Sequence, residues 1–479
     1  MSSPKKSILW FRQDLRLIDN PALLKAIESE EVIPLYILDD DNAGKWKMGG
    51  ASRVWLHHAL DDLNKQLDGK LNLYQGKADD IIPHLVSEYD VGAIHWNRCY
   101  EPWRINRDTG LKSALTSTEG LLVKTYNASL LWEPWEIAKK DGTPYRVFTP
   151  YYRKGCLNAH PPAEPKPKPN NINATKLPCS LTLEALSLLP TKPAWHQTIM
   201  SLDDWDISEQ GAHDRLNDFL DNGINSYRQG RDFPAMKSVS GLSPYLHFGQ
   251  ISPHTVWQAA SKLEADKNRD HFLSELGWRE FSYYLLYHFP TLPHDNFQAK
   301  FNDFPWQDDD GWLRAWQQGK TGVPMVDAGM RQLWQTGYMH NRVRMIVGSF
   351  LIKNLLINWR HGQDWFWDCL FDADLASNAA SWQWVAGSGA DAAPYFRIFN
   401  PVTQGQKFDP NGDYIRQYVP ELKDMPNKYI HCPWEADFST LREANVMLGK
   451  TYPSPIVDLK ESRQRALEAY QVVKSDSAA

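Results

Sequence analysis

Residues 7–38 read SILWFRQDLRLIDNPALLKAIESEEVIPLYIL, and this stretch decides the N-terminal fold. Two apolar runs, SILWF and VIPLYIL, flank a segment in which apolar residues recur every three or four positions, which is the period of a helix. Asp19 or Asn20 can cap that helix, and Pro21 suits its first turn. A strand, a helix and a second strand in this order predict a βαβ unit with parallel strands.

The same alternation continues to about residue 130. Three further apolar runs, LNLYQG (71–76), VGAIHW (91–96) and LLVKTY (121–126), are separated by helical patterns such as SRVWLHHALDDLNKQL (52–67). We therefore predict a Rossmann-like α/β domain over residues 1–130, built on a five-stranded parallel sheet. No GxGxxG sequence follows the first strand, so the usual dinucleotide-binding signature is missing.

The character of the chain changes twice after this domain. Eight of its 31 prolines lie between Pro161 and Pro193, a composition typical of a semi-extended connector that packs little core. We place an interdomain connector over residues 131–204. From 205 to 479 the helical period dominates, as in HFLSELGWREFSYYLLYHF (271–289) and VRMIVGSFLIKNLLINWR (343–360). The larger C-terminal domain is therefore predicted to be all-α.

Composition excludes several classes of protein. The 52 Lys and Arg against 58 Asp and Glu give a formal charge of −6, so a nucleic-acid binder of this composition needs a local basic face. No stretch approaches the roughly 18 apolar residues of a membrane span, and the N-terminus has no secretion signal. The five cysteines form no CxxC pair and the 15 histidines no HExxH, so we predict an intracellular protein without a structural metal.

Two helical faces carry residues that could do chemistry. Glu275, Trp278 and Arg279 recur at i, i+3 and i+4, so they share a face that could hydrogen-bond, stack and bind phosphate. A surface Glu–Arg pair beside a core Trp is the simpler alternative.

Asn341, Arg344 and Met345 form a second face. A buried Arg344 needs a carboxylate partner, which we expect in the segment DADLASNAASWQW (372–384).

That segment and a second one are candidates for a cofactor pocket. Asp372, Asp374, Asn378, Trp382 and Trp384 stand among small residues that let a flat ligand approach closely, although ordinary helix packing also favours small residues. In SYRQGRDFPAMKSVSGLSPYLHFGQIS (226–252), a Ser-rich turn precedes a helix, an arrangement that suits a phosphate or a plain capped turn. Ten of the 21 tryptophans fall between residues 278 and 384, where they could pack, stack on a ligand or carry electrons.

Taken together, these segments resemble the photolyase/cryptochrome flavoprotein family over nearly the whole chain. The resemblance is carried by WFRQDLRLIDNPAL (10–23), WREF (278–281), GMRQLWQTGYMHNRVRM (329–345), DADLASNAASWQW and DAAPYFRIFNPVTQGQKFDPNGDYIRQYVPEL (391–422). Within the family, the chain is most similar to bacterial class I cyclobutane pyrimidine dimer (CPD) photolyases. The resemblance implies an N-terminal antenna domain and a C-terminal helical domain that binds FAD.

The resemblance also implies roles for individual residues. The residues expected to hold FAD are Tyr227, Val239, Ser240, Gly241, Leu242 and Ser243 at its phosphates, and Arg344, Asp372, Ala373, Asp374 and Asn378 around its ring. Within the second group, Arg344 and Asp372 pair beside the isoalloxazine and Asn378 faces N5, where it favours the reduced flavin. Val239 and Gly241 depart from the hydroxyl and basic residues of many relatives.

Substrate and electron-transfer roles follow in the same way. Glu275, Trp278, Asn341, Met345 and Trp384 are expected to line the pocket for a flipped-out dimer in UV-damaged DNA. Trp382, Trp359 and Trp306 match the family's electron-transfer triad. Arg231, Arg279, Arg342 and Arg397 are expected to contact DNA phosphates.

The predicted function is light-driven repair of CPDs by a monomeric, cytoplasmic bacterial enzyme with no membrane partner. A second, light-harvesting chromophore would be methenyltetrahydrofolate or a deazaflavin. Its identity stays open, because WNRCYEPWRINRD (96–108) lacks the Asn–Glu pair of a folate-binding subgroup, and Cys99 stands where some deazaflavin-type members have an acid.

Three other family members are alternatives. A (6-4) photolyase needs histidines where this chain has Asn341 and Met345. A signalling cryptochrome often has a long C-terminal extension or lacks the pocket carboxylate, whereas this chain has Glu275 and ends soon after its last helical pattern. A DASH-type cryptochrome, acting mainly on single strands, is disfavoured by the sequence and not excluded.

Overall fold

The computed structural model of the chain describes residues 4–197, 199 and 204–476, and a parallel sheet forms its N-terminal part. The strands are β1 (Lys6–Phe11), β2 (Glu31–Leu38), β3 (Asn72–Gln75), β4 (Ala93–Asn97) and β5 (Leu122–Tyr126). Their order in the sheet is β3-β2-β1-β4-β5, and every neighbouring pair is parallel. The predicted five-stranded parallel sheet is confirmed.

The first βαβ unit forms where the sequence places it. Helix α1 (Pro21–Ala26) begins with Pro21, and Asn20 is its cap, since its side chain accepts a hydrogen bond of 3.1 Å from the backbone N–H of Leu23. Asp19 does not cap the helix. It adopts a positive φ of 50° and accepts from the backbone N–H of Lys166, which ties the connector to this corner.

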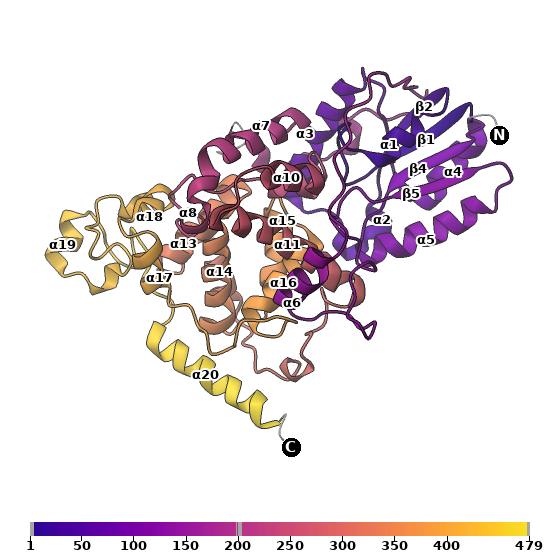
Figure 1. The fold of residues 1–479 in the computed structure, drawn as a ribbon. Helices are drawn as coiled ribbons and strands as arrows, with labels where there is room; N and C mark the ends of the chain where they lie inside the picture. Colours follow the sequence, from indigo (N-terminus) through magenta and orange to yellow (C-terminus); the bar gives the residue numbers. More distant parts are fainter. Residues whose placement is uncertain (1–3, 198, 200–203, 477–479) are drawn as a thin grey trace.

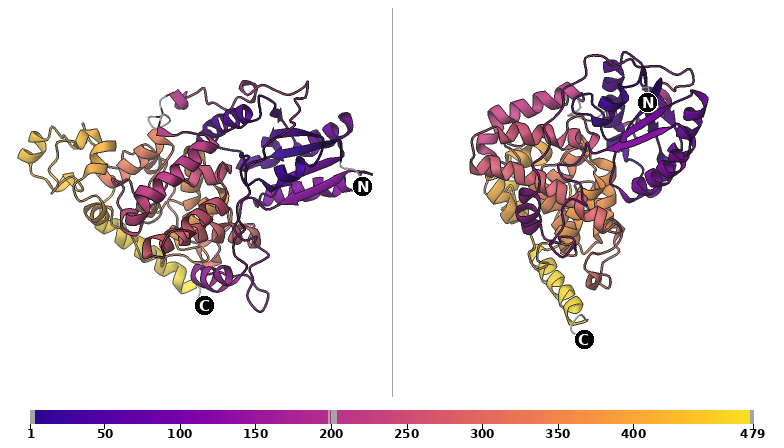
Figure 2. Two further views of the ribbon diagram at one scale, coloured as in Figure 1. Left: turned by 45° about the horizontal axis from the view of Figure 1, so that its top comes forward. Right: turned by 45° about the vertical axis from the view of Figure 1, so that its right-hand side comes forward.

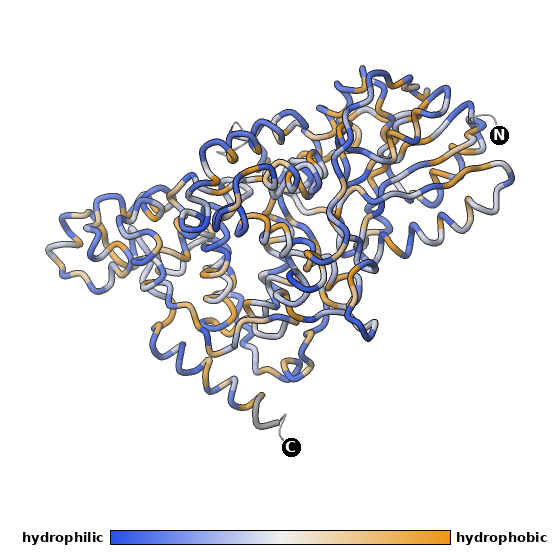
Figure 3. Tube along the Cα trace, in the orientation of Figure 1, coloured by the Kyte–Doolittle hydropathy of each residue, from blue (hydrophilic) through white to orange (hydrophobic). Residues whose placement is uncertain are grey.

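Helices cover the sheet, as Figure 1 shows. They are α2 (Asp40–Ala43), α3 (Gly50–Gln66), α4 (Ala78–Glu88) and α5 (Pro102–Thr116). The strands β1, β2 and β4 are almost entirely buried, as expected for a parallel sheet covered on both faces. In Figure 3 the strands accordingly carry hydrophobic stretches, and the outer loops are largely hydrophilic.

The connector packs more closely than its prolines predict. Ala174 forms a parallel bridge with Val32 of β2, and Leu181 an antiparallel bridge with Leu73 of β3. Trp195 is buried, and a short helix, α6 (Phe148–Pro150), joins the hydrophobic core of the helical domain. Residues 198 and 200–203, at the end of the predicted connector, lie outside the described residues. The domain boundaries at 130/131 and 204/205 stay predictions.

The C-terminal domain is helical, as predicted, and lies beside the sheet domain in all views of Figures 1 and 2. Its helices are α7 (Glu209–Asp218), α8 (Tyr227–Gly230), α9 (Ser243–Phe248), α10 (Pro253–Ser261), α11 (Lys267–His288), α12 (Asp310–Gln317), α13 (Pro324–Thr336), α14 (Asn341–Ser349), α15 (Trp359–Cys369), α16 (Leu375–Ala386), α17 (Pro401–Phe408), α18 (Asp413–Tyr418), α19 (Phe438–Glu443) and α20 (Leu459–Asp476). Helix α16 packs against both α11 and α15, which brings the predicted site residues of three helices together.

One hydrophobic cluster continues from the sheet domain into the helical domain. Trp55 of α3 contacts Tyr245 and Phe248 of α9 and also Phe371, with ring centroids 5.0 to 6.3 Å apart. This shared core fixes the helical domain against the sheet. No helix within the described ranges combines the length and the apolar character needed to cross a membrane.

Candidate functional site

A cavity of about 570 Å³ opens in the helical domain. Helices α8, α9, α11, α14 and α16 supply most of its lining. The predicted site residues that line it are Tyr227, Arg231, Ser240, Leu242, Ser243, Glu275, Trp278, Arg279, Asn341, Arg344, Met345, Asp372, Ala373, Asp374, Asn378, Trp382 and Trp384. The cavity is therefore lined by segments that lie more than 150 residues apart in the sequence.

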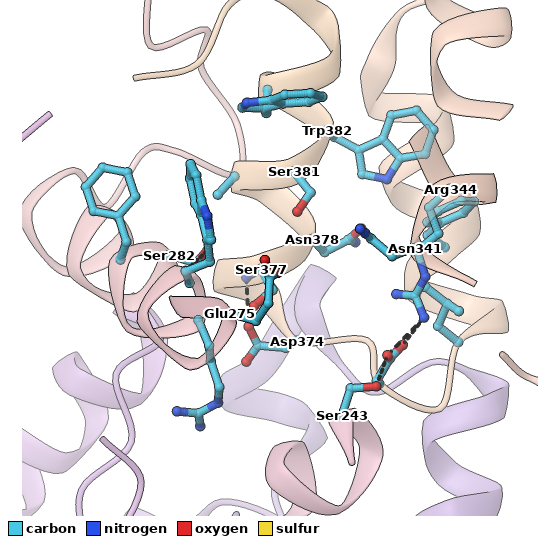
Figure 4. Close-up of a pocket in the computed structure, with 18 of the residues that line it drawn as sticks. Ser243, Glu275, Ser282, Asn341, Arg344, Asp374, Ser377, Asn378, Ser381 and Trp382 are labelled. Atoms are coloured by element: carbon cyan, nitrogen blue, oxygen red, sulfur yellow. Dashed lines mark hydrogen bonds and ion pairs between the residues drawn. The ribbon is translucent and has the colours of Figure 1, made fainter. Parts of the chain in front are cut away.

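An ion pair crosses one side of this cavity, as predicted for Arg344. The Arg344 guanidinium donates to both oxygens of Asp372, at 2.9 and 3.1 Å, and Ser243 Oγ donates to the same carboxylate at 2.5 Å. Figure 4 shows this chain of contacts running from Arg344 on α14 to Ser243 at the start of α9. A third contact, from Arg344 Nε to the carbonyl of Met339, fixes the plane of the guanidinium.

Asp374 caps helix α16 and stays ionised. Its Oδ1 accepts from the backbone N–H of Ser377 at 2.7 Å, and its Oδ2 accepts from the Tyr283 hydroxyl. Burial alone would favour the neutral acid, but the His247 ring 3.8 Å away and the hydrogen bonds from Tyr283 and the Ser377 backbone prevail and lower the pKa of Asp374 to about 2. The cavity wall therefore carries a permanent negative charge at this point.

Asn378 lies one turn further along α16 and points into the cavity with Ser377 and Ser381 (Figure 4). Its side-chain N–H donates to the carbonyl of Gln363 on α15 at 3.0 Å. This contact fixes the amide orientation, so that Oδ1 is the atom available to a ligand. Ser377 and Ser381 were not among the predicted residues, although their i, i+4 spacing on the helix of Asn378 could have indicated them.

The opposite wall holds a second charged pair. Arg231 donates to Glu275 Oε1 and, at 2.8 Å, to the ring of His271. Burial and the neighbouring Arg231 lower the pKa of His271, so the neutral ring can accept this bond. Within the described part of the chain these contacts involve only Oε1 of Glu275, so Oε2 remains available to a ligand.

Helix α14 begins at the cavity with Asn341. His340 is its cap, and Nδ1 of this ring accepts from the backbone N–H of Arg342 at 3.2 Å. Burial, together with nearby arginines, lowers the pKa of His340 to about 4, so the ring is neutral at physiological pH. His340 was missed in the sequence, because no helix-capping rule distinguishes it from any other polar residue before a helix.

Several predicted residues lie outside the cavity lining. Trp359 is fully buried and its indole N–H donates to Asn296 at 2.9 Å, whereas Trp306 is half-buried. Val239 and Gly241 belong to the turn before α9. Arg342 pairs with Asp232 at 2.7 Å, and Arg397 is exposed in the segment between α16 and α17.

Arg279 lines the cavity, but its guanidinium has partners within the protein. It donates to the carbonyl of Ser129 at 2.8 Å and pairs with Glu280 at 3.1 Å. Burial raises the pKa of Glu280 to about 7 even beside this arginine. These contacts join helix α11 to the end of the sheet domain, a role that a sequence pattern of surface arginines does not predict.

Comparisons with known proteins agree with this architecture. The model of the DNA photolyase family matches residues 7–170, and that of the FAD binding domain of DNA photolyase matches residues 272–472. A deoxyribodipyrimidine photo-lyase of Agrobacterium fabrum is 51% identical over 98% of both chains. Cryptochrome-2 of Arabidopsis thaliana is 37% identical over 98% of this chain and 79% of its own.

Two solved structures share the fold. A bacterial class III photolyase from Agrobacterium tumefaciens superposes with a TM-score of 0.93 at 49% identity, covering 99% of this chain and 98% of its own. An archaeal photolyase from Sulfolobus tokodaii, described with two FAD molecules, gives a TM-score of 0.80 at 29% identity, over 97% of this chain and 99% of its own.

The fold and the cavity are thus those of a two-domain flavoprotein, and the chain belongs to the DNA photolyase family, which includes the cryptochromes. The predicted family, fold class and FAD-binding domain are confirmed, and the photo-lyase relatives bear out the predicted enzyme class. The expected similarity to class I members stays a prediction, because a relative at 49% identity is described as class III.

The cavity at the carboxyl edge of the sheet is small. The cavity there measures about 30 Å³, roughly the space of one water molecule. Its lining includes Trp10 and three arginines, of which Arg12 pairs with Asp108, and Arg107 with Asp39 at 3.0 Å. The related archaeal photolyase is described with a light-harvesting cofactor, and the identity of a second chromophore here stays a prediction.

Proposed function

We propose that this protein repairs cyclobutane pyrimidine dimers in DNA with light, using FAD held in the cavity of the helical domain. The observation that carries the proposal is that one cavity joins two sets of side chains. Arg344, Asp372 and Asn378 are suited to a flavin ring, and Glu275 and Trp278 to a pyrimidine pair. The similarity to photo-lyases over nearly the full chain supports the same reading.

The cavity residues fit FAD in charge and in size. The volume of about 570 Å³ lies within the range of cofactor sites. Arg344 supplies a fixed cation, and Asn378 supplies an acceptor oxygen. Tyr227, Ser240 and Ser243 line the part of the cavity that we assign to the phosphates. When bound and reduced, FAD would supply the photoexcited electron that splits the dimer and would then recover it.

The protein's own residues would select and hold the substrate. A fused dimer stacks and pairs poorly, so its extrusion from the duplex costs less than that of normal bases. Trp278 and Trp384 offer apolar faces for the extruded dimer, and Oε2 of Glu275 and the Asn341 amide offer hydrogen bonds to its edges. Arg231, Arg342 and Arg397 would contact the phosphates around the opening.

The tryptophans would keep the flavin reduced. Trp382 lines the cavity, Trp359 lies in the core, and half-buried Trp306 reaches the protein surface. We assign these three residues to a path that carries electrons inward from solvent. Since repair returns its electron, this path is needed only to prepare the enzyme.

The test uses two oligonucleotides, one with a single thymine CPD and one with a (6-4) lesion, irradiated with the reduced protein and analysed by chromatography. Repair of the CPD alone is the expected result. Repair of the (6-4) lesion instead would contradict the proposal. Glu275→Ala should lower the repair yield while FAD stays bound, and Asp270→Ala, at an exposed position of the same helix, should not.

A signalling cryptochrome is the second candidate, favoured by the 37% identity to the Arabidopsis protein. The same experiment separates the two candidates. A signalling protein would bind FAD and respond to light without repairing either lesion.

A further inference from the structure

Phe148 lies directly behind Trp278. The two rings are parallel within 12° and their centroids are 3.8 Å apart, which is close face-to-face contact. Phe148 belongs to α6 in the connector, whereas Trp278 belongs to α11, 130 residues later. One face of the Trp278 indole is therefore covered by the protein, and a ligand ring in the cavity has access only to the other face.

The stack continues behind Phe148. The Tyr152 ring is parallel to that of Phe148 within 10°, at a centroid distance of 5.4 Å. Tyr152 can lie this close to α11 because residue 277 is glycine: a Cβ there would stand 2.5 Å from Cδ2 of Tyr152. Three rings are thus layered outward from the cavity, with Trp278 as the innermost.

A backbone contact ties this stack to the facing wall of the cavity. The N–H of Phe148 donates to Oδ2 of Asp391 at 2.8 Å, and Asp391 itself lines the cavity. The segment that carries Asp391 is joined to α16 by a hydrogen bond from the N–H of Ala393 to the carbonyl of Trp384. Phe148 therefore connects the two walls from which Trp278 and Trp384 face the cavity.

This arrangement matters because a stacking surface binds best when it is already in place. A tryptophan at a cavity rim loses rotamer freedom when a ligand orders it, and a side chain packed on one face has lost that freedom beforehand. The hydrogen bond of Phe148 is made by its backbone, so a change of side chain leaves the tether intact. The ring alone can therefore be tested.

We propose that Phe148 is a positioning residue for dimer recognition, which holds the Trp278 indole in the plane where it stacks on the extruded dimer. The proposal rests on the proposed function for its substrate. It assigns to the connector a part in the binding site that its proline-rich composition does not suggest.

The experiment compares Phe148→Leu, which keeps apolar volume without the ring, with Phe148→Tyr, which keeps the ring. The FAD-loaded protein is titrated with a CPD oligonucleotide and with its undamaged counterpart. In the leucine variant we expect the Kd for the CPD to rise about fivefold. The Kd for undamaged DNA, the FAD content and the repair yield of bound dimer should not change, and the tyrosine variant should restore the affinity.

A double-mutant cycle shows whether Phe148 acts through Trp278. If it does, Phe148→Leu should have little further effect on CPD affinity once Trp278 is replaced by leucine. Additive losses would overturn the proposal. So would an equal loss of affinity for damaged and undamaged DNA, or no loss in the Phe148→Leu single variant.

Positioning can also be measured without DNA. Protein labelled with 5-fluorotryptophan should give one narrow ¹⁹F resonance for Trp278, assigned by its absence in Trp278→Leu. In Phe148→Leu this resonance should broaden or split, and an unchanged line would contradict the proposal. If the line changes as expected but wild-type protein does not distinguish CPD from undamaged DNA, the proposed function fails and the positioning role stands.

Discussion

Two cavities in the described part of the chain, one at the edge of the sheet and one in the helical domain, differ in volume by more than tenfold. The carboxyl edge of the parallel sheet is where open α/β folds usually bind ligands, yet its cavity measures only about 30 Å³. The helical domain encloses about 570 Å³. A Rossmann-like topology therefore does not by itself locate the binding site.

The two cavities differ in whether the charged side chains fill the space themselves or lie on the wall of an open cavity. At the sheet edge, the Arg107 guanidinium lies over the rings of Trp10 and Trp103. It forms ion pairs with Asp39 and Asp108. The protein thus satisfies its own charges and fills the space. In the helical domain, Arg344 and Asp372 also pair, but they lie on the wall of an open cavity with hydrogen-bonding groups that face inward.

The largest expected effect is on the free energy of unfolding, from a substitution at the carboxyl edge of the sheet. Arg107→Leu leaves the buried carboxylate of Asp39 without its cation and leaves Asp108 with Arg12 alone, so the free energy of unfolding should fall by about 3 kcal/mol, measured by denaturant titration of the FAD-loaded protein. The bound FAD per folded molecule should stay the same. Arg53→Leu is the control, because its pair with Asp40 is more exposed and should contribute less than about 1 kcal/mol. Loss of FAD in Arg107→Leu would show that the edge supports the cavity after all.

Breaking the ion pair between Arg344 and Asp372 in the cavity should weaken the binding of FAD. Asp372→Asn leaves Arg344 without its carboxylate, and we expect the dissociation constant of FAD to rise about 30-fold, equivalent to about 2 kcal/mol. Flavin fluorescence during dilution measures the release. Asp232→Asn, which breaks the pair with Arg342 outside the cavity lining, should leave FAD binding unchanged. Equal effects of the two variants would contradict the role given to Asp372.

Because of Asp374, the free energy of unfolding should depend on pH in the acid range. Its folded-state pKa of about 2 is below the ordinary value, so its stabilisation is complete above about pH 4 and is lost as the pH falls towards 2. A shift of nearly two pH units corresponds to about 2 kcal/mol. Asp374→Asn should therefore unfold more easily than wild type by up to this amount at pH 7. The gap should close towards pH 2, and a gap that did not change with pH would contradict the assignment.

The smallest effect separates two neighbouring tryptophans of α16. Trp382→Phe should slow photoreduction of oxidised FAD by about tenfold, roughly 1.4 kcal/mol in barrier, while repair by chemically reduced protein continues. Trp384→Phe is the matched control, because we assign this residue to substrate stacking, and it should photoreduce normally. Transient absorption measures the rate, and a normal rate in Trp382→Phe would remove this residue from the path.

The sequence predicted the sheet and the helical class because both depend on local periodicity. It also predicted a carboxylate partner for Arg344, on the expectation that its guanidinium is buried. Asp372 provides the partner, and the arginine itself is half-buried. What it could not predict are contacts between distant segments. The stack of Phe148 on Trp278 and the bond from Arg279 to Ser129 depend on tertiary packing that no spacing rule contains.

The carboxyl edge of the sheet shows a second limit of prediction from the sequence. The sequence of β1 and α5 shows where arginines and tryptophans occur, but whether they surround a ligand or fill the space themselves depends on side-chain packing. For this reason the second chromophore was expected from the resemblance alone, and no spacing of residues in the sequence locates its site.

The repair function proposed for the cavity is tested most directly with protein reconstituted with FAD as its only chromophore. A thymine CPD oligonucleotide is irradiated with the reduced protein at a series of wavelengths, with a dark control. Both thymines should be restored only in light, with an action spectrum that follows the absorption of reduced FAD. No repair by protein with FAD bound and reduced would contradict the proposed repair function.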